Sequence, residues 1–305
     1  ERVTRVKHQG GIPHKAIKYC LDTAGLARDD IGHIGCYMRP GMRLMRRIPY
    51  RLRQVLRSPR YSAAYIGYEF IHNVQYVAGL RDLRGRNTKL HFMEHHPAHA
   101  ASAFLVSPFE RAALLTIDYI GEWPVTWAGI GEGTQVRRLF SESYPNSLGV
   151  FYTAITDYLG FLRASDEYKV MGLASYGKPE YLDEFRKIVS LERGGRYRLD
   201  LSCFQCHYLP GSRHGYFSKK FVERFGPARN KGEAVEDRHA NIAASAQAVL
   251  EETVLHTARH VHEETGLTDL CMAGGVALNC AMNGCLLRES PFERIYVQPA
   301  AGDDG

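Results

Sequence analysis

The sequence predicts a mixed α/β fold for this chain of 305 residues. Three β-rich runs, at residues 112–118, 125–131 and 135–141, follow one another with only glycines and short polar turns between them, which is typical of an antiparallel meander. A long amphipathic pattern at residues 241–265 then leads into an apolar run at residues 270–273. A meander followed by alternating helix and strand indicates an α/β arrangement.

Composition and charge argue against several classes of protein. The chain is 45% hydrophobic and 24% charged, which suits a globular protein with one large core or two lobes. Its formal net charge of +6 is modest, so nucleic acid is not an expected partner. No run of 18 apolar residues occurs, and we expect no membrane span. Seven cysteines without framework spacing favour a reduced, cytoplasmic location.

The first hundred residues contain short predicted elements. Pro13 begins an amphipathic helix at residues 14–24. Strands are expected at residues 33–38 and 89–93, and a helix continues from the second strand to Leu105.

Residues 39–60 hold eight arginines and no acidic residue. We expect this segment to be a solvated face or a mobile insertion. The alternative is a surface that receives an anionic substrate or a partner domain.

Helical patterns follow the meander at residues 149–159 and 170–174, and residues 181–230 are aromatic, basic and expected to be irregular. Within the irregular segment, Cys203, Cys206 and His207 match the spacing of a haem c attachment site. No second Cys/His pair stands at finger spacing, so we expect these residues to bind neither haem nor zinc.

A candidate metal site begins with His95 and His99, which stand four apart near a predicted helix start. Residues i and i+4 share one helix face, so both imidazoles can reach a common ion, although such a pair often serves no metal. Asp118 ends the next predicted strand, and Asp303 follows a later apolar segment. Two imidazoles and two carboxylates suit Fe(II), Mn(II) or Zn(II).

A candidate nucleotide turn lies between the predicted strand at residues 270–273 and a helix. Gly274 and Gly275 permit close approach to the backbone, so that adenosine or a phosphate could rest on exposed N–H groups, with Asn279 in the first helical turns. We expect Gly275→Val to block nucleotide binding while sparing the metal. Ser147 and Gly149 form a weaker candidate of the same kind.

A third group lies at residues 166–174. Lys169 could hold phosphate, and Glu167 could bind ribose or a metal-bound water. The alternative is a surface salt bridge beside a tightly packed Gly172.

These motifs together resemble the NodU/CmcH-type O-carbamoyltransferases, a family that modifies nodulation factors, cephamycins and aminoglycosides. The resemblance extends in the family's order over nearly the whole chain, at residues 1–8, 95–100, 116–122, 167–174, 273–279 and 299–305. It implies an actin/sugar-kinase/Hsp70-like fold of ribonuclease-H type, similar to the tRNA threonylcarbamoyl-transferring proteins. Duplicated βββαβα lobes would then occupy approximately residues 1–145 and 146–305.

The resemblance also assigns the candidate residues. The implied metal ligands, with Fe(II) the favoured ion, are His95, His99, Asp118 and Asp303. The implied nucleotide-loop residues are Gly274, Gly275 and Asn279, followed by Glu167, Lys169 and Gly172.

In that family a second, YrdC-like domain makes carbamoyl-adenylate from carbamoyl phosphate and ATP, and the first domain transfers the carbamoyl group to a hydroxyl. The family pattern begins before Glu1 and continues past Gly305. We therefore expect this chain to be incomplete at both ends and to need a YrdC-like domain in cis or in trans.

The predicted activity is transfer of a carbamoyl group to a hydroxyl of a small secondary metabolite or a glycan. Asp118, Glu122 or a histidine could serve as the base. The alternatives are a tRNA threonylcarbamoyl-type transferase, an ATP-dependent phosphotransferase, which would not need the histidine pair, and a non-catalytic scaffold. A homodimer is left open.

Overall fold

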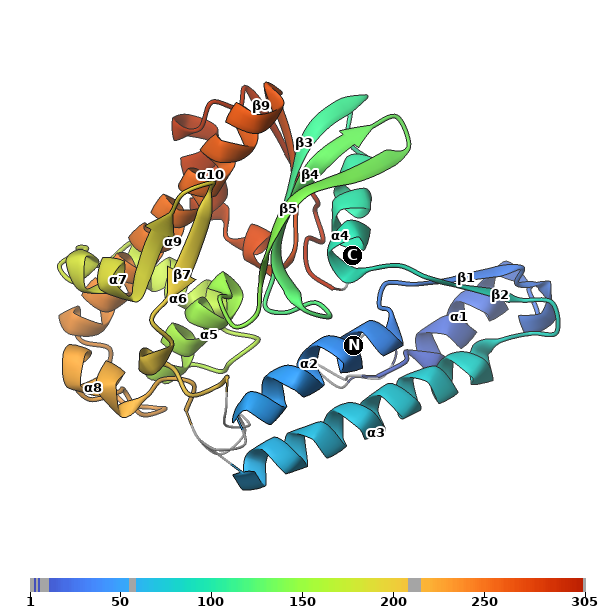
Figure 1. Ribbon diagram of the computed structural model, residues 1–305, viewed down its shortest axis with the longest axis horizontal. Helices are drawn as coiled ribbons and strands as arrows, with labels where there is room; N and C mark the ends of the chain where they lie inside the picture. Colours follow the sequence, from blue (N-terminus) through green and yellow to red (C-terminus); the bar gives the residue numbers. More distant parts are fainter. Residues whose placement is uncertain (1–2, 4, 6–10, 55–58, 208–214, 304–305) are drawn as a thin grey trace. The chain divides into compact units, whose positions relative to one another are not determined.

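The computed structural model describes residues 3, 5, 11–54, 59–207 and 215–303 (Figure 1). The chain divides into two compact units, Glu1–His95 and His96–Gly305, and the division falls at the first residue of helix α4. Most of the motif at residues 1–8, and Asp304 with Gly305, lie outside the described residues. The two units are not the two predicted lobes, whose division near residue 145 stays a prediction.

The described part of the first unit contains a parallel pair of strands and three α-helices. Strands β1 (His33–Cys36) and β2 (Lys89–Phe92) pair in parallel. Between them in the chain lie α2 (Pro40–Gln54) and α3 (Pro59–Leu83), and before them α1 (His14–Ala24) and a single 3₁₀ turn at Arg28–Asp30. The predicted helix at residues 14–24 and both predicted strands are confirmed, whereas α3 was not predicted.

The described part of the arginine-rich segment before residue 55 is neither irregular nor fully solvated. It forms α2, in which Arg47 is 6% exposed and donates to Glu69 of α3 across 2.8 Å. The guanidinium of Arg51, also 6% exposed, lies 3.7 Å from the ring centre of Tyr65. The expectation of a solvated face is therefore wrong for these two arginines, because α3 brings a carboxylate and an aromatic ring to them.

The second unit is built on a five-stranded sheet of order β5-β4-β3-β8-β9. Its strands are β3 (Arg111–Ile117), β4 (Pro124–Glu132), β5 (Gln135–Ser143), β8 (Asp269–Ala273) and β9 (Arg294–Val297). Strands β3, β4 and β5 pair antiparallel, which confirms the meander, and β8 and β9 extend the sheet in parallel with β3. The mixed α/β prediction is confirmed. Among the described residues a sheet of this size occurs once.

Helices cover both faces of this sheet (Figure 1). Alternate residues of β3 point to opposite faces: Ala113 and Leu115 pack with α5 (Leu148–Tyr158) and α9 (Asp237–Thr265), and Leu114 packs with α4 (His95–Phe104). Both faces of β3 are thus buried, which explains its continuous apolar sequence. The carboxyl end of β3 is thereby fixed between two layers of helix.

The segment at residues 181–230 was expected to be irregular, and that expectation is wrong for much of it. It contains α7 (Leu182–Ile188), the antiparallel hairpin β6 (Val189–Glu192) and β7 (Arg196–Leu199), and α8 (Lys219–Phe225). Phe185, Phe204 and Phe225 of this segment pack with Phe151 of α5 in a buried aromatic cluster, so they reflect core packing and not a loop.

A short 3₁₀ helix, Leu201–Cys203, begins after Asp200 in this segment. Partial burial raises the pKa of Asp200, but hydrogen bonds from Ser202 and Lys220 outweigh it and hold the pKa at about 2. Two further helices complete the second unit, α6 (Glu167–Ala174) and α10 (Cys280–Glu289). None of the helices in the described part of the chain is long and apolar enough to cross a membrane.

Candidate metal centre

Helix α4 carries both candidate histidines at its beginning. His95 and His99 are one helical turn apart and are 2% and 7% exposed. The other side of α4 packs Ala100, Ala103 and Phe104 against the sheet. Packing of this apolar side fixes the direction in which the histidines point.

Two carboxylates from distant parts of the chain meet these histidines. Nε2 of His99 lies 3.2 Å from Oδ2 of Asp118 and 3.2 Å from Oδ1 of Asp303. One ligand atom from each of His95, His99, Asp118 and Asp303 lies within 4.8 Å of all the others. The four residues predicted as metal ligands therefore lie together, and their two imidazoles and two carboxylates fit a divalent transition metal.

Asp118 is held by the backbone at the end of β3. Its Oδ1 accepts from the N–H of Tyr119 at 2.7 Å and from the N–H of Gly275 at 3.1 Å. Its Oδ2 is thereby directed to His99. One carboxylate thus joins the metal cluster to the glycine turn that follows β8.

The turn at Gly274 and Gly275 needs glycine because three segments meet there. Gly274 has φ +90°, and a Cβ at that position would clash with the carbonyl oxygen of Ile117. The N–H of Gly274 donates to the carbonyl of Ala301 at 2.7 Å. A Cβ at Gly275 would lie 2.9 Å from Oδ1 of Asp118.

These contacts confirm the tight turn but correct the reason for it. The N–H groups of both glycines donate to acceptors within the chain, so they are not the exposed phosphate donors that the sequence suggested. The glycines instead let the ends of β3 and β8 approach each other behind the metal cluster.

Ser147 and Gly149 support the same strand end from the other side. Ser147 is fully buried, donates to the carbonyl of Tyr119 at 2.6 Å and accepts from Val150 N at the start of α5. A Cβ at Gly149 would lie 2.6 Å from Cα of Tyr119. Both residues hold the backbone that carries Asp118; a direct nucleotide contact by either stays a prediction.

Asn279 precedes α10 and does not lie in its first turns. It separates the 3₁₀ turn Gly275–Leu278 from α10 and caps α10 by accepting from Met282 N at 3.0 Å. Its amide exchanges two hydrogen bonds, of 2.8 and 3.0 Å, with that of Gln247 on α9. Asn279 is 9% exposed, so these contacts make it a residue that positions the turn.

With this geometry established, comparison with known proteins places the chain. A family model described as carbamoyltransferase N-terminus matches residues 1–305. The chain belongs to this family. The family membership predicted from the motifs is thus confirmed.

Relatives of this carbamoyltransferase-family chain are longer than it is. An uncharacterized protein of Synechocystis sp. is 40% identical and aligns with 100% of this chain and 51% of its own length. The nodulation proteins NolNO of Sinorhizobium fredii and NolO of Bradyrhizobium diazoefficiens are 34% and 41% identical, over 100% and 70% of this chain and 42% and 36% of their own lengths. The crystal structure of T. kodakarensis HypF is a distant match, with a TM-score of 0.36 at 17% identity over 75% of this chain and 36% of HypF. The chain spans about half the length of these relatives or less.

In this carbamoyltransferase-family chain, α6 carries the third group of candidates. The carboxylate of Glu167 accepts from Thr153 Oγ1 and from Ala164 N, each at 2.8 Å. Lys169 is exposed and forms an ion pair with Asp166 at 3.0 Å, which confirms the alternative of a surface salt bridge. The other half of that alternative is wrong, because a Cβ at Gly172 would meet nothing within 4 Å.

Glu122 lies in the loop between β3 and β4, four residues after Asp118, and is 1% exposed. Its role as a base stays a prediction. The sequence did not single out Tyr119, whose hydroxyl lies 2.8 Å from that of Tyr216. Burial raises the pKa of Tyr119 well above its usual value. Tyr119 stands in the same motif as Asp118, which was the one signal that could have indicated it.

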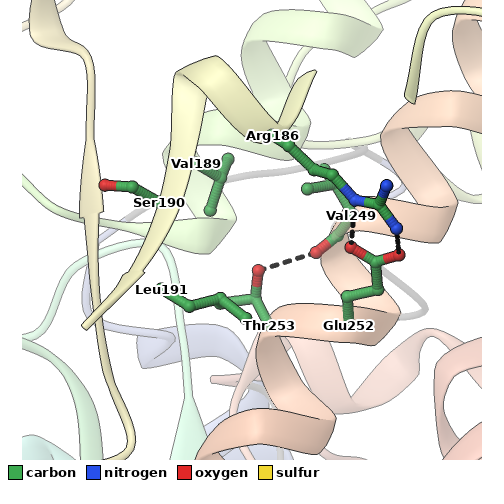
Figure 2. A pocket seen from close by; sticks show the side chains of 7 residues that line it. All are labelled: Arg186, Val189, Ser190, Leu191, Val249, Glu252 and Thr253. Carbon is green, nitrogen blue, oxygen red and sulfur yellow. Dashed lines mark hydrogen bonds and ion pairs between the residues drawn. The ribbon is translucent and has the colours of Figure 1, made fainter. Parts of the chain in front are cut away.

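A depression of about 290 Å³ in the second unit is separate from this site (Figure 2). It is lined by residues of α7, β6 and α9, and none of the candidate residues borders it. Arg186 and Glu252 close one side with hydrogen bonds of 2.5 and 3.0 Å, and Thr253 donates to the carbonyl of Val249. The polar groups drawn in this depression are thus hydrogen-bonded to each other.

Proposed function

We propose that this chain is the transfer part of a carbamoyltransferase, which moves a carbamoyl group from carbamoyl-adenylate to an acceptor hydroxyl. Family membership supports carbamoyl transfer. The single observation that supports a reaction centre in this chain is the convergence of two histidines and two aspartates beside the glycine turn. Carbamoyl-adenylate would come from carbamoyl phosphate and ATP, made by a YrdC-like domain in cis or in trans.

The four clustered residues, His95, His99, Asp118 and Asp303, would hold one divalent ion, with Fe(II) favoured over Mn(II) and Zn(II). When bound, such an ion polarises a carbonyl group and offsets negative charge on a phosphate. Three of the ligands are buried, whereas the side chain of Asp303 is 58% exposed. The exposed side of the cluster is therefore where we propose that the adenylate approaches.

The nucleotide would lie over α6 and the start of α10. Sγ of Cys280 lies 3.7 Å from Sδ of Met171, so the surface of α6 beside Gly172 adjoins the beginning of α10. Gly172 and Leu278 are exposed there, and open space in front of Gly172 leaves room for a flat base. An adenosine in this position would direct its phosphate along the turn towards Asp118.

Glu122 is the proposed base for the acceptor hydroxyl. Asp118 accepts hydrogen bonds from two backbone N–H groups and faces His99, so its oxygens serve to bind and orient. A carboxylate oxygen of Glu122 would take the hydroxyl proton while the hydroxyl oxygen attacks the carbamoyl carbon and AMP leaves. The acceptor would be a hydroxylated metabolite or glycan, in line with relatives named as nodulation proteins.

We also propose a ribonuclease-H-type topology for the second unit. In chain order its strands lie 3-2-1-4-5, with only the second antiparallel to the first. Helices on both faces accompany this order. The strand order supports one lobe of the fold that the resemblance implies.

The test supplies synthetic carbamoyl-adenylate to the 305-residue chain loaded with Fe(II), Mn(II) or Zn(II), and measures bound metal and AMP release with hydroxylated acceptors. His99→Ala should lose both metal and acceptor-dependent AMP release. His260→Ala, on α9 beside Gly195, is the matched control and should keep both. Metal retained at full stoichiometry by His99→Ala would refute the site. Phosphate transfer to the same acceptors when ATP is supplied in place of carbamoyl-adenylate would favour the phosphotransferase alternative.

A further inference from the structure

Helices α2 and α3 form an antiparallel hairpin, and the contacts described between them involve charged side chains. The Arg47–Glu69 pair and the contact between Arg51 and Tyr65 show which residues of the two helices face each other. In each facing pair the two residue numbers add up to 116. Charged groups therefore lie between the helices, where helical hairpins commonly place apolar side chains.

Four large apolar side chains lie on the outside of this hairpin. Met45 and Leu52 of α2 are 76% and 57% exposed, and Phe70 and Val74 of α3 are 58% and 50% exposed. They belong to two series with alternating spacings of four and three residues, the pattern of a helix seam that packs against another helix. We call these the α2 seam (Gly41, Met45, Ile48 and Leu52) and the α3 seam (Ala63, Gly67, Phe70 and Val74).

Both seams lie on one face of the hairpin. At 100° per residue, the α2 seam is rotated about 100–160° from the contact direction of Arg47, and the α3 seam by a similar angle from that of Glu69. Because the helices run antiparallel, equal rotations lead to the same side. Arg46 and Arg53, which are exposed, lie on the opposite side.

No close contact among the described residues explains the glycines of the seams. A Cβ at Gly67, in the middle of α3, or at Gly41 would meet nothing within 4 Å. Glycine inside a helix costs roughly 0.5–1 kcal/mol relative to alanine. A small residue at this cost is expected where another backbone or a large side chain approaches closely.

The seams are complementary to themselves. If two hairpins stack face to face about a twofold axis perpendicular to the helices, each residue meets its mirror position in the second copy, and in three of the four pairs a small residue opposes a large one. The resulting pairs, each with one residue from the second copy, are Gly67 with Phe70, Ala63 with Val74, Gly41 with Leu52 and Met45 with Ile48.

The same twofold axis produces the pairs of both seams. The α2 pairs are centred between residues 46 and 47, and the α3 pairs between residues 68 and 69. The contact between Arg47 and Glu69 places these two centres at nearly the same level of the hairpin. We propose that this face binds a second copy of the chain as an antiparallel four-helix bundle.

The charge and the area of the proposed interface determine how tightly the two copies bind. The described side chains of both seams are uncharged, so no like charges meet, although each copy has a formal net charge of +6. Each seam spans about 18 Å, and two helices are about 20 Å wide, so the footprint is roughly 360 Å² per copy, below the ~800 Å² of a standard interface. We therefore expect a dimer that dissociates in the micromolar range.

The test is sedimentation velocity of the 305-residue chain over roughly 1–300 µM protein. Phe70→Glu should weaken the dimer by about 100-fold or more, because the charge enters the interface twice. Arg53→Glu, which reverses a charge on the opposite face, should leave the dissociation constant within about threefold. Phe70 is exposed, so an unchanged thermal unfolding temperature would show that Phe70→Glu still folds.

A size exchange tests the proposed pairing itself. Gly67→Phe should weaken the dimer, since it opposes Phe70 of the second copy, and adding Phe70→Ala should restore it. A chain that stays monomeric at 300 µM, or one whose dimer survives Phe70→Glu, would overturn the proposal. Failure of the double variant to recover would refute the stated register.

Discussion

The backbone that carries Asp118 can be tested by adding a single methyl group at Gly149. A Cβ there would lie 2.6 Å from Cα and 2.7 Å from N of Tyr119, and 2.9 Å from the carbonyl carbon of Asp118. Ordinary contact begins near 3.4 Å, so the strand end must retreat by roughly 0.8 Å (3.4 minus 2.6). These atoms are backbone, and no flexible side chain can absorb the shift.

The expected cost follows from two opposing effects. Overpacking a tight core site destabilises by about 1–3 kcal/mol, and replacing glycine by alanine in a helix returns about 0.5–1 kcal/mol. Gly149→Ala should therefore destabilise the chain by up to about 2.5 kcal/mol. Gly172→Ala is the matched control: it also lies in a helix, but its Cβ meets nothing, so it should stabilise by about 0.5–1 kcal/mol.

Urea unfolding of both variants, with and without added metal, separates packing from ligand binding. Metal that binds only the folded chain raises stability in proportion to its affinity. If the shift of Asp118 weakens the site, the gain on adding metal should be smaller for Gly149→Ala than for Gly172→Ala. Equal stability of the two variants, with equal gains from metal, would refute the close approach of α5 to the metal-binding strand end.

Three further predictions concern groups outside the site. Glu69→Ala should lower the free energy of unfolding in urea by about 3–5 kcal/mol, because it leaves the guanidinium of Arg47 buried without its counter-charge. Replacing both residues, by leucine and methionine, should lower the free energy of unfolding by less. Because the pKa of Asp200 is about 2, below its value in the unfolded chain, its stabilisation is present at neutral pH and is lost as the pH falls towards 2. Asp200→Asn should thus lower stability at pH 7, with the difference from the parent chain shrinking in acid. Burial raises the pKa of the Cys203 thiol to about 11, so in the folded chain iodoacetamide should modify the exposed Cys280 well before Cys203, as peptide mass spectrometry would show.

Elements whose signals are local were predictable from the sequence. The meander needs only apolar alternation and nearby turns, and His95 with His99 needs only helical spacing. Helix α3 was not predicted because its exposed side includes Phe70, Ile71 and Val74 while Glu69 is buried, which obscures the usual apolar periodicity. The hairpin of β6 and β7 was not predicted, because its stability depends on packing against α9 and not on its own sequence pattern.

Site contacts between distant positions could not be derived from spacing. Asp303 meets His99 across 204 residues. The sequence offered Asp303 as a further acid after an apolar segment, and the family resemblance named it as a ligand, but spacing could not show that it meets His99. Asn279 pairs with Gln247, which lies 32 positions earlier in the chain. The sequence could therefore suggest that Asn279 contacts a nucleotide, but not that the side-chain amide of Gln247 is its partner. Hydrogen-bond partners of backbone groups, such as the N–H of Gly274, are likewise set by tertiary structure.

The last prediction concerns whether metal and nucleotide binding are separable. The sequence suggested that a side chain at Gly275 would block the nucleotide and spare the metal. In the structure a Cβ at Gly275 would lie 2.9 Å from Oδ1 of Asp118, the atom to which the N–H of Gly275 donates. Something must move at that distance, and the carboxylate is the movable group. Hydrogen-bond partners of a metal ligand are commonly worth 10–100-fold in metal affinity, so Gly275→Ala should weaken Mn(II) or Zn(II) binding by about that factor in calorimetric titration, whereas Gly172→Ala should not. Unchanged metal affinity combined with loss of binding of an ATP analogue would instead support the prediction from the sequence, that a side chain at Gly275 blocks the nucleotide and spares the metal. The expected outcome is that any side chain at this turn weakens both, because Asp118 belongs to the turn and to the metal cluster.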